Sequence, residues 1–152
     1  MSDLPLVFTF KDLLSGNGFY AHIEASGRVM LTREEGGYWM RGVNPGGLAA
    51  SGAERSEAFR EFKKGYLSVL YDIAAEAPSY DAFAAEVESF FNETNEPTCL
   101  EWDTARERVR RGELDDDKLE KVSGAKAQVK VDEIRVPTPA ANEIDPDYAQ
   151  AA

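Results

Sequence analysis

The sequence predicts an α+β fold, in which an antiparallel sheet of three to five strands packs against one long helix, followed by a second helix and an irregular C-terminal extension. Three observations lead to this prediction. The first fifty residues consist of short β-rich runs separated by glycine turns, which is typical of antiparallel hairpins. Apolar residues then recur at spacings of three and four, which indicates an amphipathic helix. Beyond residue 95 neither pattern is strong.

The chain has 152 residues, of which 43% are apolar, so a single globular domain with a small appendage is expected. We divide it into an α+β domain at 1–95, an extension packed on that domain at 96–136, and a flexible tail at 137–152. The tail contains prolines, small residues and acids, which favour an extended chain.

The strands of the domain are expected at 6–10, 19–24, 28–33, 38–43 and 48–51. The turns between them are expected at 15–18, 26–27, 34–37 and 44–47. Each of these turns contains glycine, which permits tight reversals of the chain. One more strand is expected at 128–136, where valines alternate with charged residues.

The clearest helix is expected at 55–75 and ends before Pro78. Its apolar stripe consists of Phe59, Phe62, Tyr66, Leu67, Leu70 and Ile73. A second helix is expected at 80–92, with Ser79 as its N-cap. Its stripe consists of Phe83, Val87, Phe90 and Phe91. Residues 103–111 are expected to form a helical turn or two.

Acidic side chains outnumber basic ones by 28 to 17, which gives a net charge of −11. Residues 1–75 carry 8 basic and 9 acidic side chains, whereas residues 76–152 carry 9 and 19, so the acidity is concentrated in the second half. Such a chain repels nucleic-acid phosphates over most of its surface and would attract a basic protein. Solubility alone is an equally simple reason for the acidity.

Catalytic, metal and cofactor sites are not expected. His22 is the only histidine and Cys99 the only cysteine, which excludes a multi-histidine metal site and a disulfide within the chain. Asp115, Asp116 and Asp117 lack the spacing of a calcium loop and indicate a solvated acidic loop. The sequence shows no membrane span and no signal peptide, so we expect a cytoplasmic protein. Because no convergent set of polar groups can be named, we do not expect an enzyme.

Neighbouring residues of a strand face opposite sides of a sheet, so the direction of Trp39 determines which of its neighbours are exposed. If Trp39 faces the helix, Tyr38 and Met40 face the other way and form a candidate surface for a protein partner. Alternatively, the C-terminal segment covers that face. An open sheet edge would also allow pairing with a partner strand or with a second copy of the chain.

Residues 28–71 resemble the HicB-like antitoxin domain, in which a strand, a glycine turn, an aromatic-bearing strand, a Pro-Gly crossing and a short strand precede a long helix. The matching residues are Gly36-Gly37-Tyr38-Trp39-Met40, Asn44-Pro45-Gly46-Gly47-Leu48, Ala50-Ser51-Gly52-Ala53 and Ser56-Glu57-Ala58-Phe59. The family places Thr, Ser or Asp at the start of the helix, where this chain has Glu54, so Ser51 with Glu54 is expected to form a capping box one register earlier.

The resemblance implies an antitoxin that neutralises a small basic ribonuclease toxin by protein–protein contact. Partner contact is then expected from Tyr38, Met40 and Arg41, together with Asp115, Asp116 and Asp117. Many family members also bind operator DNA through a C-terminal helix-turn-helix or ribbon-helix-helix. Neither pattern follows Ala77, and the acidic run opposes phosphate binding, so DNA binding is doubtful here.

Two alternatives remain open from the sequence. The concentration of acids after residue 75 would suit a nucleic-acid mimic or an inhibitor of a nucleic-acid-binding protein. An orphan relative of the antitoxins with a structural role, most simply a homodimer, would need no toxin partner.

Overall fold

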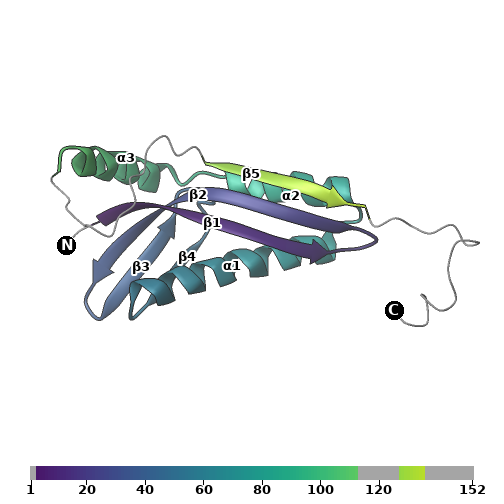
Figure 1. Ribbon diagram of the computed structural model, residues 1–152, viewed down its shortest axis with the longest axis horizontal. Coiled ribbons are helices and arrows are strands. Elements are labelled where there is room, and N and C mark those ends of the chain that lie inside the picture. The colour runs from purple at the N-terminus through teal and green to yellow at the C-terminus, as the bar shows by residue number, and fades with distance from the viewer. Residues whose placement is uncertain (1–2, 113–126, 136–152) are drawn as a thin grey trace, which may run out of the picture.

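A computed structural model describes residues 3–112 and 127–135 of the chain. It has the predicted α+β class, with an antiparallel sheet of five strands and three helices in the described ranges. The helices lie on both sides of the sheet, so the sheet forms the middle layer (Figure 1).

The sheet is built around β2 (Tyr20–Glu34), which has neighbours along both of its edges. β1 (Asp3–Ser15) pairs with one edge of β2 over its whole length. The other edge is shared: β5 (Gln128–Ile134) pairs with residues 20–26, and β3 (Gly37–Gly42) pairs with residues 29–34. β4 (Ala49–Gly52) extends the sheet beyond β3.

A turn predicted at 26–27 is absent, and β2 continues through it as one strand. Gly27 is needed there for close packing, because a Cβ atom at this position would lie 2.2 Å from the ring of Phe8 and 2.2 Å from the carbonyl oxygen of Asn44. The glycine at 36 does form the predicted tight turn, and its φ of +86° is readily adopted only by glycine.

Both long helices occupy the predicted ranges: α1 spans Arg55–Glu76 and α2 spans Tyr80–Asn92. The Ser79 hydroxyl oxygen accepts a hydrogen bond from the amide of Ala82, which confirms the predicted cap of α2. The expected capping box at α1 is wrong, because Glu54 itself is the N-cap residue and makes no side-chain cap bond.

A third helix, α3 (Glu96–Arg110), is much longer than the one or two turns that the sequence indicates. Its stability comes from packing and capping rather than from a wide apolar stripe. The Asn95 side chain accepts a hydrogen bond from the amide of Thr98 at 3.2 Å and so satisfies one free N–H of the first turn.

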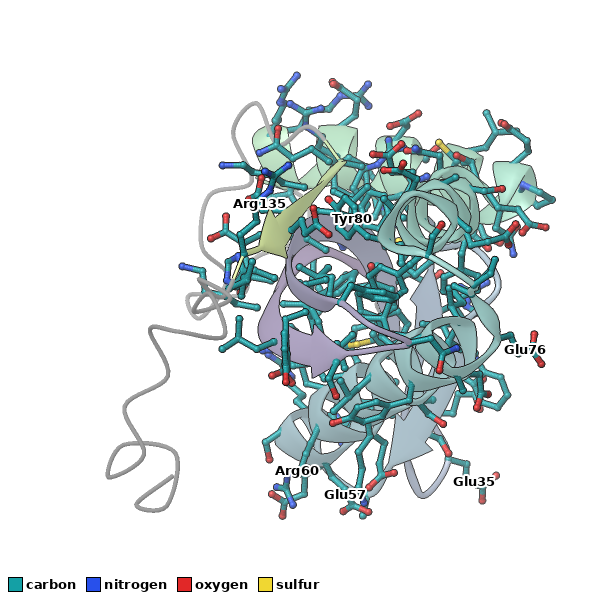
Figure 2. The ribbon with its side chains drawn as sticks, turned by 90° about the vertical axis from the view of Figure 1, so that its right-hand side faces the viewer. Glu35, Glu57, Arg60, Glu76, Tyr80 and Arg135 are labelled. Carbon is teal, nitrogen blue, oxygen red and sulfur yellow. The ribbon has the colours of Figure 1, made fainter. Side chains whose placement is uncertain are left out.

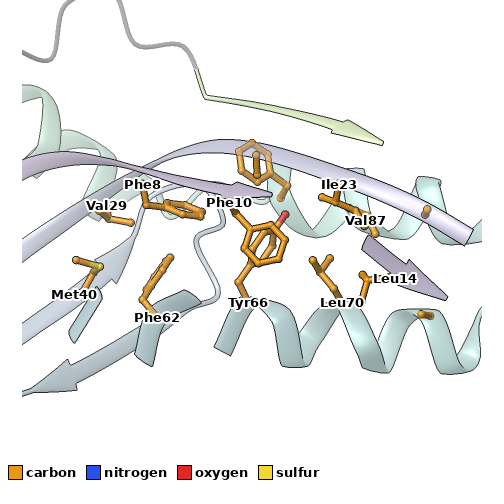
Figure 3. Close-up of a cluster of buried hydrophobic side chains, with 14 of the residues drawn as sticks. Phe8, Phe10, Leu14, Ile23, Val29, Met40, Phe62, Tyr66, Leu70 and Val87 are labelled. Atoms are coloured by element: carbon orange, nitrogen blue, oxygen red, sulfur yellow. The ribbon is translucent and has the colours of Figure 1, made fainter. Parts of the chain in front are cut away.

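The main core lies between the sheet and the two long helices (Figure 3). Phe8 and Phe10 of β1 point toward α1, where their rings pack edge-to-face on Phe62 and Tyr66 with centroids 5.1 and 4.8 Å apart. Ile23 of β2 lies in the same layer. The alternate residues of these strands therefore face away from α1 and α2.

Part of that opposite face is covered by α3, which is anchored by Trp102. The indole is buried with Met30 and Val43, and its Nε1 donates a hydrogen bond to the Leu6 carbonyl oxygen at 3.1 Å. The Arg28 guanidinium lies 5.4 Å from the ring centroid, within range of a cation–π contact. Together these contacts fix α3 against one end of the β1–β2 pair.

Tyr66 and Tyr80 provide a test that compares an unpaired hydroxyl group with a hydrogen-bonded one. The Tyr66 hydroxyl is buried without a hydrogen-bond partner in the described part of the chain, whereas the Tyr80 hydroxyl donates to the Val131 carbonyl oxygen at 3.1 Å. Because an unpaired buried hydroxyl is unfavourable, Tyr66→Phe should raise the free energy of unfolding by about 1 kcal/mol. Tyr80→Phe should lower it by about 1 kcal/mol. Urea denaturation of both variants measures the difference, and a loss of stability in Tyr66→Phe would contradict the assignment.

The stability of the protein should also depend on Tyr66 at alkaline pH. Burial raises the pKa of this hydroxyl above its ordinary value of 10.0. Above pH 10 the unfolded chain therefore releases a proton that the folded chain retains, so stability falls as pH rises. The slope from this residue approaches about 1.4 kcal/mol per pH unit. In a pH series of urea titrations, Tyr66→Phe should show a correspondingly shallower decline than the wild type.

Candidate protein-binding surface

The structure reverses the expected facing of β3. Met40 points toward α1 and is fully buried in the main core, so the prediction that it contacts a partner is wrong. Tyr38 lies on the same side, half-buried, with the Arg55 guanidinium 5.8 Å from its ring centroid. Trp39 faces the other way and is 40% exposed.

The reason for this facing is the pairing of β2 with β3 across the turn at Gly36. The hairpin register places Met40 opposite Leu31, and directly opposed residues share a face of the sheet. Leu31 is buried against α1, so Met40 must be as well. A tight turn at 35–36 was predictable, and counting outward from it identifies Trp39 as the outward residue.

Arg41 shares the outward face with Trp39 and links the sheet to α3. Its Nη1 lies 2.9 Å from the Glu101 carboxylate oxygen Oε2, and its Nη2 donates to the Thr32 hydroxyl at 3.3 Å. The Thr32 hydroxyl in turn donates to the Asp3 carboxylate at 2.8 Å. These bonds hold the guanidinium in one place, half-buried at the surface.

We call Trp39, Thr32, Arg41 and Glu101 the Trp39 surface. Thr32 and Ser51 are the cross-strand neighbours of Trp39, so the indole stands between two small side chains. An exposed tryptophan beside an ordered arginine is the composition found at the energetic centre of protein interfaces. Of these residues, sequence reasoning selected Arg41 alone.

A buried polar network fixes the loop that follows β3. The Asn44 side-chain oxygen accepts from the Arg28 Nη2 at 2.6 Å, and its amide nitrogen donates to the Thr94 hydroxyl at 2.7 Å. In the same loop, the Gly46 amide donates to the Glu93 carbonyl oxygen. A Cβ at Gly46 would lie 2.4 Å from the Asn95 nitrogen, so glycine is required for this approach. The end of β3 is thereby tied to the start of α3.

The acidic character of the chain is concentrated in one continuous stretch. Residues 65–105 contain nine acidic side chains and neither lysine nor arginine. All nine are exposed, on the second half of α1, on α2 and its flanks, and on the first half of α3. Glu76, for example, projects into solvent at the end of α1 (Figure 2). A field of this sign attracts a cationic partner.

The remaining predicted residues do not form a chemical site in the described ranges. No group of three or more His, Cys, Asp or Glu side chains there could hold a metal ion. His22 lies on β2 opposite Leu13, and Cys99 is half-buried on α3 with its Sγ 4.0 Å from Asp103. Asp115, Asp116 and Asp117 lie outside the described residues.

Comparisons of the chain with protein-family models, with curated proteins and with solved structures find no match. Inferences about function therefore depend on the residues of this chain. In the described ranges, no helix has the length and apolar character required to cross a membrane.

The two tryptophans should differ sharply in their effect on stability. Trp102→Ala removes the buried anchor of α3 and should lower the free energy of unfolding by about 3–5 kcal/mol. Trp39→Ala removes a largely exposed ring and should change it by less than about 1 kcal/mol. Urea denaturation followed by far-ultraviolet circular dichroism measures both. A large loss in Trp39→Ala would mean that this ring stabilises the fold and is not free for a partner.

Proposed function

We propose that this protein is a HicB-like antitoxin that binds a small basic ribonuclease toxin through the Trp39 surface and neutralises it by covering it. The observation that carries the proposal is the exposed Trp39 ring beside the Arg41–Glu101 ion pair. Residues 65–105 of the same chain contain nine acidic side chains and no lysine or arginine.

The first support is the rigidity of the Trp39 surface. Arg41 is bonded to both Thr32 and Glu101, and the loop after β3 is held by Asn44. A partner that docks there meets side chains that are already ordered, so little conformational entropy is lost on binding. Such pre-organised aromatic and arginine side chains supply most of the energy in typical interfaces.

The second support is charge. The acidic stretch extends from α1 through α2 to α3, and Glu101 belongs both to it and to the Trp39 surface. Three of its acids, Glu96, Glu101 and Asp103, lie on α3, on the same side of the sheet as the Trp39 surface. They would attract a basic ribonuclease over about one Debye length, roughly 8–10 Å in physiological salt. Its association rate should consequently fall as the salt concentration rises.

The third support is the order of elements between residues 28 and 71. The end of β2, the turn at Gly36, β3, the loop at 43–48, β4 and α1 follow one another as in the family that the sequence resembles. In this proposal the protein acts by contact and carries out no reaction, and operator DNA is not its ligand.

The proposal predicts that Trp39→Ala weakens binding to the toxin by about 30-fold or more, the effect of losing a central aromatic residue of an interface. The partner to test is the small basic protein encoded by the adjacent reading frame, and isothermal titration calorimetry measures the affinity. Tyr71→Ala is the matched control, because Tyr71 is a 53% exposed aromatic residue on α1, on the other side of the sheet. It should leave the affinity unchanged.

Two results would contradict the proposal. One is the absence of any complex with a small basic neighbour, and the other is equal affinity of the wild type and Trp39→Ala. Binding that is insensitive to Trp39 but abolished by moderate salt would instead favour the second candidate, a nucleic-acid mimic that acts through the nine exposed acids of residues 65–105.

A further inference from the structure

A second surface lies on the same side of the sheet as the Trp39 surface, where β1, β2 and β5 extend beyond α3 (Figure 1). We call it the open face. Strand register arranges its outward side chains in rows of three, one residue from each strand. The two middle rows are Lys11, Glu24 and Lys130, and Leu13, His22 and Asp132.

One end of the open face is apolar. Leu13 is 61% exposed, Tyr20 is 53% exposed and Ile134 is 37% exposed. Tyr20 lies directly opposite Ile134, and Leu13 lies diagonally across from Tyr20 in the neighbouring row, so all three are at the same end of the face. Exposed apolar clusters of this kind mark interaction surfaces.

The other end of the open face is hollow. A depression of about 870 Å³ lies there, bordered by the outermost row of Thr9, Ser26 and Gln128. The neighbouring row of Lys11, Glu24 and Lys130 and the side chain of Lys63 on α1 line it as well. The open face therefore has an apolar end and a recessed polar end, and the row of Leu13, His22 and Asp132 lies between them.

The charges of the open face favour a second copy of this chain over a basic partner. Lys11 and Lys130 balance Glu24 and Asp132, so the face is neutral on a chain with a net charge of −11. A basic protein therefore gains no net attraction from these four side chains, and the same side chains of a second copy are not repelled by them. The pairs Lys11–Glu24 and Lys130–Asp132 are already 3.2 and 3.7 Å apart within one chain.

We propose that two copies of the protein pack open face to open face around a two-fold axis that runs parallel to the rows, between the row of Lys11 and the row of Leu13. This axis places the row of Lys11 over the row of Leu13 of the second copy, and the row of Leu13 over the row of Lys11 of that copy. Asp132 then faces Lys130 of the second copy, and His22 faces Glu24 of the second copy. The two-fold axis repeats each of these contacts, so opposite charges meet on both sides of the axis.

The same axis brings the two ends of the open face together. The apolar row with Tyr20 and Ile134 lies over the hollow row of the second copy, so Tyr20 lies over Ser26 of that copy and enters the depression. Sheets that pack face to face with aligned strands lie about 10 Å apart, which leaves room for such interdigitation. The helix α3 limits the overlap, since it already covers the sheet beyond Thr9.

The open face has twelve outward side chains, fewer than the roughly 20–30 residues per side of a standard interface. We therefore infer a dimer in concentration-dependent equilibrium with the monomer. This inference does not rest on the proposed toxin partner, because the Trp39 surface is made by the far end of β2, by β3 and by α3, outside the twelve residues of the open face.

Charge exchange on β5 tests the proposed axis. Lys130→Asp places two acids opposite each other across the axis, and Asp132→Lys places two lysines there, so each single variant should raise the dimer dissociation constant at least tenfold. The double variant Lys130→Asp/Asp132→Lys restores opposite charges and should return it to within about threefold of the wild type. Sedimentation velocity of the full chain over a concentration series measures these constants.

Tyr20→Ser provides an independent test of the apolar end. It should shift the equilibrium toward monomer at least tenfold, whereas Tyr71→Ser, an equally exposed tyrosine on α1, should not. A wild type that stays monomeric at every concentration would overturn the proposal. A double charge variant that dissociates as readily as the two single charge variants would also overturn it. Circular dichroism shows whether each variant is folded. A dimer that is unaffected by Lys130→Asp, Asp132→Lys and Tyr20→Ser would place the interface elsewhere and equally overturn the axis.

Discussion

The alternation of side chains along β2 determines almost every surface of this protein. One set of its residues, including Ile23, Val29 and Leu31, is held against the long helices, because that burial removes the largest apolar area from water. The alternate set must then face the other way. It supplies Met30 to the packing of α3, Thr32 to the Trp39 surface, and His22 to the open face.

Arg28 connects the two polar arrangements that position α3. Its guanidinium bonds to Asn44 and also lies over the Trp102 ring, so one side chain supports both the loop after β3 and the helix packed beside it. A half-buried charge of this kind is stable only with good partners. Because these contacts position α3, they also keep Glu101 close to Arg41. The Trp39 surface therefore depends on Arg28, which is not part of it.

Much of the fold was predictable from local patterns. The limits of α1 and α2, the cap at Ser79 and the strand in the region of β5 followed from periodicity and turn residues. Two features that sequence reasoning missed are set by distant contacts. Gly27 resembles a turn residue until Phe8 is seen against it, and α3 has few apolar residues, so its length depends on Trp102. The sequence left the direction of Trp39 open, and the register of the β2–β3 hairpin turns it outward.

The position of β5 has a consequence for synthesis of the chain. Tyr20 pairs with Ile134, so one edge of the first half of β2 stays unpaired until a strand 114 residues further along the chain has been synthesised. Until then the nascent protein presents an unpaired backbone edge beside a nearly finished core, and such long-range closure is slow. Among the strands in residues 3–112 and 127–135, β5 is thus the last to leave the ribosome, and chaperone protection would matter most before it pairs.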